Sequence, residues 1–190
     1  MGIIGESGSG KTSIALSIMK LLPKYAKITG EIDYNNRVIS NLTDKEFNKY
    51  KWNKIAMVFQ NSIDALNPVL TVHEQIFECI KQHSQLKIEE INNKINNFLK
   101  MVGFDISRCM SYSHQLSGGM RQRILIAMAL SCDPELLIFD EPITALDAFS
   151  KHEIIELLNK LHKEKKFTMI VISHEMDAIL KLTSKVFVMY

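Results

Sequence analysis

Eight residues near the start of the chain have the types and spacing of a phosphate-binding loop. They follow the pattern G-x-x-x-x-G-K-[ST] and are Gly5, Glu6, Ser7, Gly8, Ser9, Gly10, Lys11 and Thr12. Glycines let the backbone wrap around a phosphate with its N–H groups pointing inward, and the positive end of a following helix adds to the attraction. The Lys11 amine can then contact the β- and γ-phosphates of a triphosphate, and the Thr12 hydroxyl can coordinate Mg²⁺. The alternative is an ordinary glycine-rich turn, but the loop lies between an apolar strand pattern and a helix pattern, which favours the phosphate site.

Two adjacent carboxylates, Asp140 and Glu141, end the apolar run at 136–139. In α/β sheets, ligands bind at the carboxyl ends of the strands. Asp140 can hold the Mg²⁺ shell there, directly or through water, and Glu141 can orient or polarise an attacking water. A carboxylate after a strand is more often a helix cap or a turn residue. The glycine loop upstream favours the catalytic interpretation.

A serine and two glycines, Ser117, Gly118 and Gly119, precede a second helix pattern that contains the run ILIAMALS. Their backbone N–H groups and the helix dipole offer a second anion-binding surface. A flexible helix start with a serine cap would look similar. The residues by themselves therefore leave both interpretations open.

Short apolar runs alternate with helical patterns along the chain, which predicts a mainly parallel sheet covered by helices on both faces. The expected strands are 3–5, 55–59, 136–140, 168–173 and 185–189, and the run LLIFD among them is expected to be fully buried. Helices are expected after Lys11, after Gly119 and over about 150–164. Two further helices between Gln60 and Gly103 form a helical insertion: one opens with a capping box at 71–74, and the other carries one apolar face made by Ile88, Ile91, Ile95 and Phe98.

The composition fits one α/β unit. The chain has 190 residues, of which 46% are hydrophobic, enough for one substantial core. Its 23 basic and 21 acidic residues leave a net charge of +2, too balanced to suggest a surface for nucleic acid or another polyanion. Three cysteines without metal-ligand spacing are typical of a reducing compartment, and no run approaches the roughly 20 apolar residues of a membrane-spanning helix. If a membrane matters, a partner crosses it.

The segment Leu116-Ser-Gly-Gly-Met-Arg-Gln-Arg123 resembles the signature motif of ATP-binding cassette (ABC) ATPases, and it lies between the glycine loop and the Asp140–Glu141 pair in that family's order. Three other positions are similar to family motifs: Gln60 to the Q-loop, Asp147 to the D-loop and His174 to the switch histidine. An isolated histidine after a strand would more often be an ordinary polar residue. The order of the motifs, which covers nearly the whole chain, favours the functional role.

The resemblance implies a P-loop NTPase of the ABC ATPase type, with ATP and Mg²⁺ as cofactors. In such a protein Glu141 orients water, His174 contacts the γ-phosphate, and the Mg²⁺ shell is contacted by Thr12, Gln60 and Asp140. Two cassettes pair head to tail, so that Ser117, Gly118, Gly119 and Asp147 of one complete the nucleotide site of the other. A core at about 1–60 and 130–190 would be RecA-like, and about 61–129 would form the helical and signature subdomain.

Segments 59–76, 112–123 and 132–147 resemble the ATPases of oligopeptide, dipeptide and nickel importers, except that Ile143 stands where threonine is typical. That resemblance implies, as partners, a homologous ATPase subunit, two transmembrane permease subunits and, indirectly, a solute-binding protein. It also implies a location at the cytoplasmic face of the cell membrane and no nucleic-acid partner.

Two alternatives to an importer ATPase stay open. A non-transport ABC ATPase of DNA repair or translation would usually bring a coiled-coil or zinc insertion or tandem cassettes. The other alternative is a fragment that binds nucleotide without turnover. The short segment 1–4 before the glycine loop and the apolar end VFVMY lead us to expect that the chain begins and stops inside a larger domain, without the family's adenine-stacking aromatic residue or the subfamily's C-terminal extension.

Overall fold

A sheet of five strands forms the centre of the protein, for which a computed structural model describes residues 1–60 and 65–190. The strand order is β4-β5-β6-β1-β7, and every neighbouring pair runs parallel. The bounds are Gly2–Gly5 (β1), Ile55–Val58 (β4), Leu136–Asp140 (β5), Thr168–Ile172 (β6) and Val186–Met189 (β7). The predicted parallel sheet is confirmed, and each predicted strand agrees with an observed one to within one residue at either end. All five carboxyl ends lie on one edge of the sheet.

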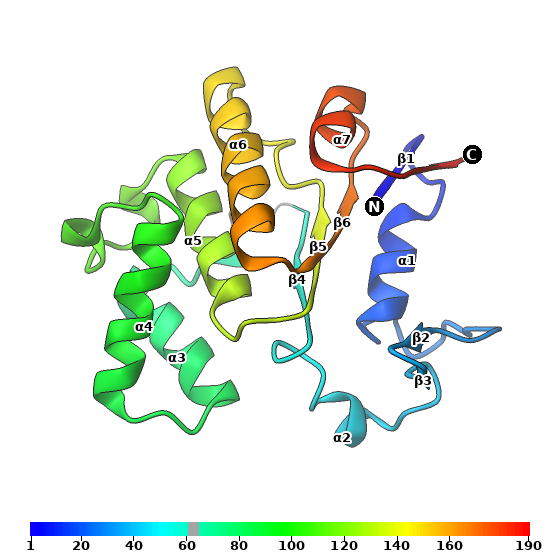
Figure 1. Cartoon of the computed structure of the whole chain (residues 1–190), viewed down its shortest axis with the longest axis horizontal. Helices are drawn as coiled ribbons and strands as arrows, with labels where there is room; N and C mark the ends of the chain where they lie inside the picture. The colour runs from blue at the N-terminus through cyan, green and yellow to red at the C-terminus, as the bar shows by residue number, and fades with distance from the viewer. Residues whose placement is uncertain (61–64) are drawn as a thin grey trace.

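Both faces of the sheet are covered. Alternate side chains of each inner strand enter opposite apolar cores: Leu137 and Phe139 of β5 enter one, and Ile138 enters the other. The first core is closed by α5 (Gly118–Leu130), α6 (Ala148–Lys165) and α7 (Met176–Leu182), and the second by α1 (Lys11–Ile18). Figure 1 shows α5 and α6 on one side of β4 and β5, with α1 on the other. This two-sided burial explains why the strands read as unbroken apolar runs. Within LLIFD only Leu136, the first residue, is partly exposed.

The predicted helical insertion consists of α3 (Val72–His83) and α4 (Ile88–Met101), which pack against α5. At the start of α3 the Glu74 amide donates to the Thr71 hydroxyl at 3.2 Å, and the Thr71 amide donates to the Glu74 carboxylate at 2.8 Å. The predicted capping box is therefore confirmed. The predicted apolar face of α4 is wrong at Ile88, which is 67% exposed, because α4 begins at this residue and its burial begins one turn later at Ile91.

The segment between α1 and β4 had no sequence-based prediction. It contains the antiparallel pair β2 (Asp33–Tyr34) and β3 (Arg37–Val38), followed by α2 (Asp44–Phe47). Asn35 and Asn36 connect the two strands with φ angles of 51° and 63°, as the tight turns of hairpins require. Phe47, which is fully buried, adds to the core beneath α1. Helix α7 and the short 3₁₀ helices at Ile106–Arg108 and Ser113–Gln115 were also missed.

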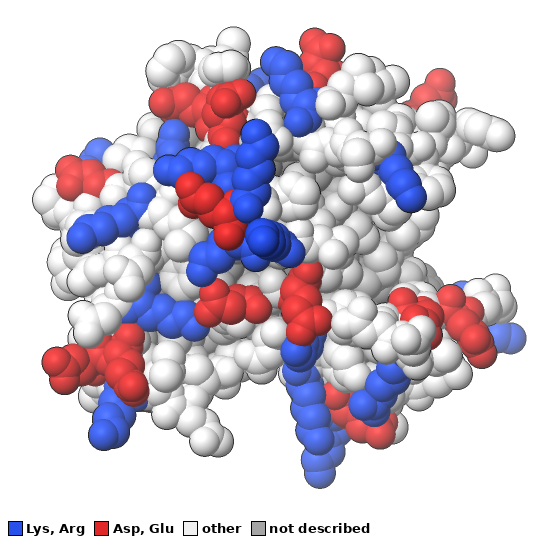
Figure 2. Space-filling model, viewed as in Figure 1, with Lys and Arg blue, Asp and Glu red and all other residues white. Residues whose placement is uncertain are grey.

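The three cysteines are free: Cys79 is buried, and Cys109 and Cys132 are partly exposed. Within residues 1–60 and 65–190, no three or more His, Cys, Asp or Glu side chains gather as a metal site would require. Of the helices described, none has both the length and the apolar character needed to cross a bilayer. On the face shown in Figure 2, acidic and basic side chains lie interspersed, in keeping with the small net charge.

Candidate active site

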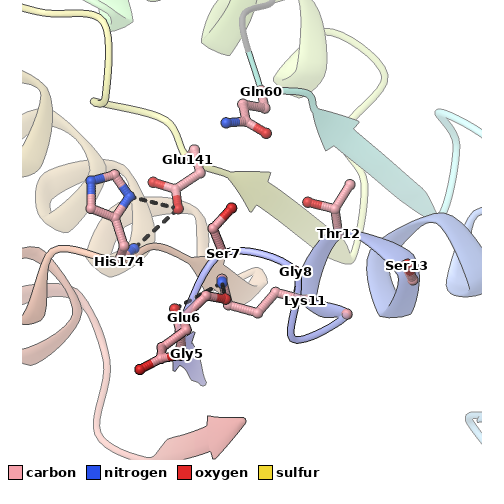
Figure 3. Close-up of a pocket in the computed structure, with 11 residues that line it drawn as sticks. Gly5, Glu6, Ser7, Gly8, Lys11, Thr12, Ser13, Gln60, Glu141 and His174 are labelled. Atoms are coloured by element: carbon pink, nitrogen blue, oxygen red, sulfur yellow. Dashed lines mark hydrogen bonds and ion pairs between the residues drawn. The ribbon is translucent and has the colours of Figure 1, made fainter. Parts of the chain in front are cut away.

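A cleft of about 550 Å³ opens at the carboxyl edge of the sheet. Its walls come from the loop after β1 and from the segments after β4, β5 and β6, which meet because parallel strands end on the same edge (Figure 3). The lining residues are Gly5, Glu6, Ser7, Gly8, Gly10, Lys11, Thr12, Ser13, Gln60, Glu141 and His174. Residues predicted from four separate motifs are thus brought into one cavity.

The glycine loop needs its glycines for different physical reasons. Gly8 and Gly10 have φ angles of 87° and 92°, in the left-handed region that side chains disfavour. At Gly5 a Cβ atom would lie 2.1 Å from the carbonyl oxygen of Met189 in the neighbouring strand, so any side chain would separate β1 from β7. The loop therefore turns sharply and delivers the N-terminus of α1, which begins at Lys11, to the cleft.

Lys11 is held inside the loop. Lys11 is only 8% exposed, and its ammonium donates to the carbonyl oxygens of Gly5 at 2.8 Å and Glu6 at 2.6 Å. Since an ammonium carries three N–H donors, these two bonds leave one for a ligand. The positive charge is therefore concentrated at the floor of the cleft, where an anion would be attracted.

Asp140 lies at the end of β5, only 1% exposed, and neither of its carboxylate oxygens has a hydrogen-bond partner among the described residues. Burial raises the pKa of Asp140 above its ordinary value, the Thr12 hydroxyl opposes that rise, Glu141 adds to it, and Lys11 opposes it. A buried carboxylate without a partner next to a hydroxyl is an oxygen donor set of the kind Mg²⁺ takes. The residues present therefore fit a magnesium ion.

Glu141 is fixed by contacts on both carboxylate oxygens. One oxygen, Oε2, accepts from the Thr144 hydroxyl at 2.6 Å and from the Ser173 hydroxyl at 3.3 Å. The other, Oε1, accepts from the backbone N–H of His174 at 3.1 Å and lies 3.0 Å from its ring Nδ1. The backbone of Glu141 has φ 51°, a left-handed conformation that a non-glycine residue adopts rarely and that clusters at functional sites. Its side chain is 7% exposed and faces His174 at the cleft (Figure 3).

Four predicted site residues lie outside this cleft. Ser117 is exposed and caps α5 by accepting from the Met120 amide at 3.3 Å, and Asp147 caps α6 by accepting from the Ser150 amide at 2.9 Å. The two helix starts touch, because a Cβ atom on Gly119 would lie 2.9 Å from the Ser150 hydroxyl. Gly118 belongs to the same patch, where a Cβ atom would lie 3.4 Å from Leu146. The structure thus gathers these four residues in a separate patch.

The remaining predicted residues lie close to the cleft or within its wall. Gln60 enters the cleft from the end of β4, across from the glycine loop (Figure 3). The Ser9 hydroxyl is turned inward and has no hydrogen-bond partner within the described part of the chain.

Sequence reasoning missed three residues of the site: Ser13, Thr144 and Ser173. Thr144 stands three positions after Glu141, and Ser173 stands directly before His174. Hydroxyls so close to two candidate catalytic residues were a signal that could have found them. The contact of Thr144 lies within one turn of the chain, whereas the contact of Ser173 depends on the pairing of β5 with β6, which the sequence does not display.

Comparisons with known proteins show what the chain is similar to. The ABC transporter family model matches residues 1–144. The dipeptide transport ATP-binding protein of Bacillus subtilis is 41% identical over 192 residues, which cover 99% of this chain and 57% of the relative. The oligopeptide transport ATP-binding protein of Escherichia coli is also 41% identical over 192 residues, covering 100% of this chain and 57% of the relative. The chain thus spans little more than half the length of these relatives.

Solved structures of ABC cassettes have the same fold. A dimeric ATP-binding cassette in a post-hydrolysis state with ADP and Pi bound matches with a TM-score of 0.85 and 30% identity, over 99% of this chain and 79% of that one. The cbiO1 protein of Clostridium perfringens, part of an ABC transporter complex, matches with a TM-score of 0.85 and 29% identity, over 99% of this chain and 72% of that one. The predicted P-loop NTPase fold, a mainly parallel sheet with an inserted helical part, is confirmed. The family model and these structures together show that the chain belongs to the ABC transporter family.

Proposed function

We propose that the cleft binds Mg-ATP and hydrolyses it, and that the chain is the nucleotide-binding part of a peptide importer. The observation that carries this proposal is the convergence of Lys11, Glu141 and His174 on one cavity, with the buried carboxylate of Asp140 beside it. An ammonium for phosphates, an unpaired carboxylate for a cation and a fixed carboxylate for water are the parts that phosphoryl transfer to water requires.

Each part has a role in the proposed reaction. The loop amides and the Lys11 ammonium hold the β- and γ-phosphates, and Thr12, Asp140 and Gln60 hold Mg²⁺ directly or through water. When bound, the cation supplies positive charge against the phosphate oxygens. Glu141 orients the attacking water and accepts its proton at a carboxylate oxygen, while His174 contacts the γ-phosphate. Catalysis is chiefly a matter of positioning, which suits a carboxylate held as rigidly as that of Glu141.

The second patch fits a role in trans. Ser117, Gly118, Gly119 and Asp147 present two helix starts outside the cleft of their own subunit, and helix N-termini attract phosphate. We propose that they complete the nucleotide site of a second, identical or homologous, ATPase subunit arranged head to tail. The dimeric state described for a solved relative supports this arrangement. ATP would then favour the closed pair because only that state completes its contacts, and hydrolysis would remove the preference.

Transport as the purpose of hydrolysis is supported by the relatives, which are described as dipeptide and oligopeptide transport ATP-binding proteins. These names favour peptides over nickel as the cargo. We propose two transmembrane permease subunits and, indirectly, a solute-binding protein as partners, at the cytoplasmic face of the cell membrane. We further propose that about 1–60 and 130–190 act as the RecA-like core, and about 61–129 as the subdomain that carries the signature.

The proposal is tested by replacing Glu141 with Gln in the full-length protein. Loss of the carboxylate should lower ATP turnover by about a hundredfold or more, and Mg-ATP binding measured by calorimetry should stay as in the wild type. Glu156→Gln, an exposed position on α6, is the matched control and should keep its turnover. Unchanged turnover of Glu141→Gln would reject the role of this residue. A wild type that binds Mg-ATP without turnover would instead favour a protein that only binds nucleotide.

A further inference from the structure

The turn after β5 folds a hydroxyl back onto the candidate catalytic carboxylate. The Thr144 amide donates to the Glu141 carbonyl at 3.5 Å, which closes a four-residue turn, and the Thr144 hydroxyl reaches the Glu141 carboxylate at 2.6 Å. Within the described residues this hydroxyl has no other side-chain hydrogen bond. Its proton must therefore point at Glu141, because an ionised carboxylate only accepts. Hydrogen bonds to an ionised acceptor are short and strong, in keeping with this distance.

The Ser173 hydroxyl contacts the same carboxylate oxygen from the end of β6, at 3.3 Å. It also accepts from the Glu175 amide at 3.0 Å, so its own proton is free to point at Glu141. The two hydroxyls hold Oε2, and His174 holds Oε1 through its backbone N–H. A carboxylate fixed at both oxygens has lost its freedom to rotate, and the entropy of orienting it is no longer lost during the reaction.

The neighbouring residue Ile143 points elsewhere, so the contact with Glu141 belongs to position 144 alone within this pair. The side chain of Ile143 is 1% exposed and belongs to the apolar core between the sheet and α5 and α6. Thr144 is the residue of the turn whose side chain bonds to Glu141. A hydroxyl in place of Ile143 would not reach the carboxylate by the same geometry, since adjacent residues of a turn project in different directions.

We propose that Thr144 is a positioning residue for ATP hydrolysis, whose hydroxyl fixes the carboxylate of Glu141 for its work on the attacking water. This inference rests on the proposed function of the cleft. Thr144 acts through Glu141 and does not line the cavity itself. Its removal should therefore slow turnover and leave the affinity for Mg-ATP unchanged.

The decisive comparison is Thr144→Val, which keeps the shape and removes the hydroxyl, against Thr144→Ser, which keeps the hydroxyl. For Thr144→Val we expect kcat to fall about tenfold, the loss typical of a hydrogen bond to a charged group, with the KM and the Kd for Mg-ATP unchanged. Thr144→Ser should restore kcat to within about twofold of the wild type. Thr168→Val, the same substitution at an exposed position of β6, is the matched control.

A double-mutant cycle separates positioning from a merely structural role. Adding Thr144→Val to Glu141→Gln should change the residual single-turnover rate by less than about twofold, because the hydroxyl acts through a carboxylate that is no longer present. A further tenfold loss, a raised Kd for Mg-ATP, or a wild-type kcat in Thr144→Val would overturn the inference. If the wild type hydrolyses ATP and Glu141→Gln does not, such a result leaves the proposed function standing. A wild type without turnover would overturn both.

Discussion

At the scale of single residues, the position of Asp140 suits its proposed function but lowers the stability of the fold. Its carboxylate is 1% exposed and has no hydrogen-bond partner among the described residues. Burial raises its pKa because water no longer stabilises the charged form. Near neutral pH the folded protein must either keep this carboxylate charged without a partner or protonate it, and both cost free energy. Either way Asp140 destabilises the fold in the absence of a cation.

Asp140→Asn should therefore raise the free energy of unfolding in EDTA at pH 7, by about 1 kcal/mol. Because the folded pKa lies above the ordinary value of 3.8, the wild type loses stability as pH rises from 3.8 through the raised pKa. The advantage of the Asn variant should grow over that interval and then level off. Urea unfolding of the wild type and the Asn variant at several pH values measures the difference in stability and its change with pH. An Asn variant less stable than the wild type at pH 7 without metal would contradict this account.

At the scale of elements, the starts of α5 and α6 constrain each other. The Ser150 hydroxyl, which a Cβ atom on Gly119 would approach to 2.9 Å, donates to the Asp147 carboxylate at 2.7 Å and so takes part in capping α6. A side chain at Gly119 would displace Ser150 and weaken that cap. The signature segment and Asp147 are therefore coupled mechanically, through one serine.

Gly119→Ala should be less stable than Gly118→Ala by about 1 kcal/mol, the typical loss of a helix cap. Gly118 is the matched control, because its added Cβ atom would make only an ordinary contact with Leu146 at 3.4 Å. Both glycines lie in the first turn of α5, so the gain in helix propensity from alanine is similar in the two variants. Thermal or urea unfolding measures the difference. Equal stabilities would mean that Ser150 can move without cost.

At the scale of the whole molecule, the cleft joins the ends of β1, β4, β5 and β6, and both apolar cores pack against these strands. A ligand bound there contacts segments from both ends of the chain at once. It should therefore stabilise the whole fold, because nucleotide binding requires the assembled edge of the sheet and the unfolded chain has none.

Mg-ATP at about a hundredfold excess over its Kd should add about 2.7 kcal/mol to the free energy of unfolding, seen as a higher Tm. Lys11→Ala should abolish that shift, because the ammonium at the floor of the cleft is the charge that we propose attracts the phosphates. Lys160→Ala, on the exposed face of α6, should keep the full shift. A shift of equal size in Lys11→Ala would argue that the nucleotide binds elsewhere.

Much of the fold was predictable because its signals are local. Short apolar runs predicted β1, β4, β5, β6 and β7, since strands buried on both faces need apolar residues throughout. The hairpin of β2 and β3 was missed because its strands have two residues each, and only the Asn35–Asn36 turn indicates it. Ile88 was assigned to the apolar face of α4 because periodicity does not tell where packing begins.

By itself the sequence determined the order of the motifs and the chemical groups available for phosphate and cation. Only the tertiary structure decided which groups share a cavity, and it separated the patch of Ser117 and Asp147 from the cleft of Lys11. It also brought Ser173 to the carboxylate of Glu141. The physical reason is that local patterns depend on neighbours in the chain, whereas these contacts depend on strand pairing between segments far apart in sequence.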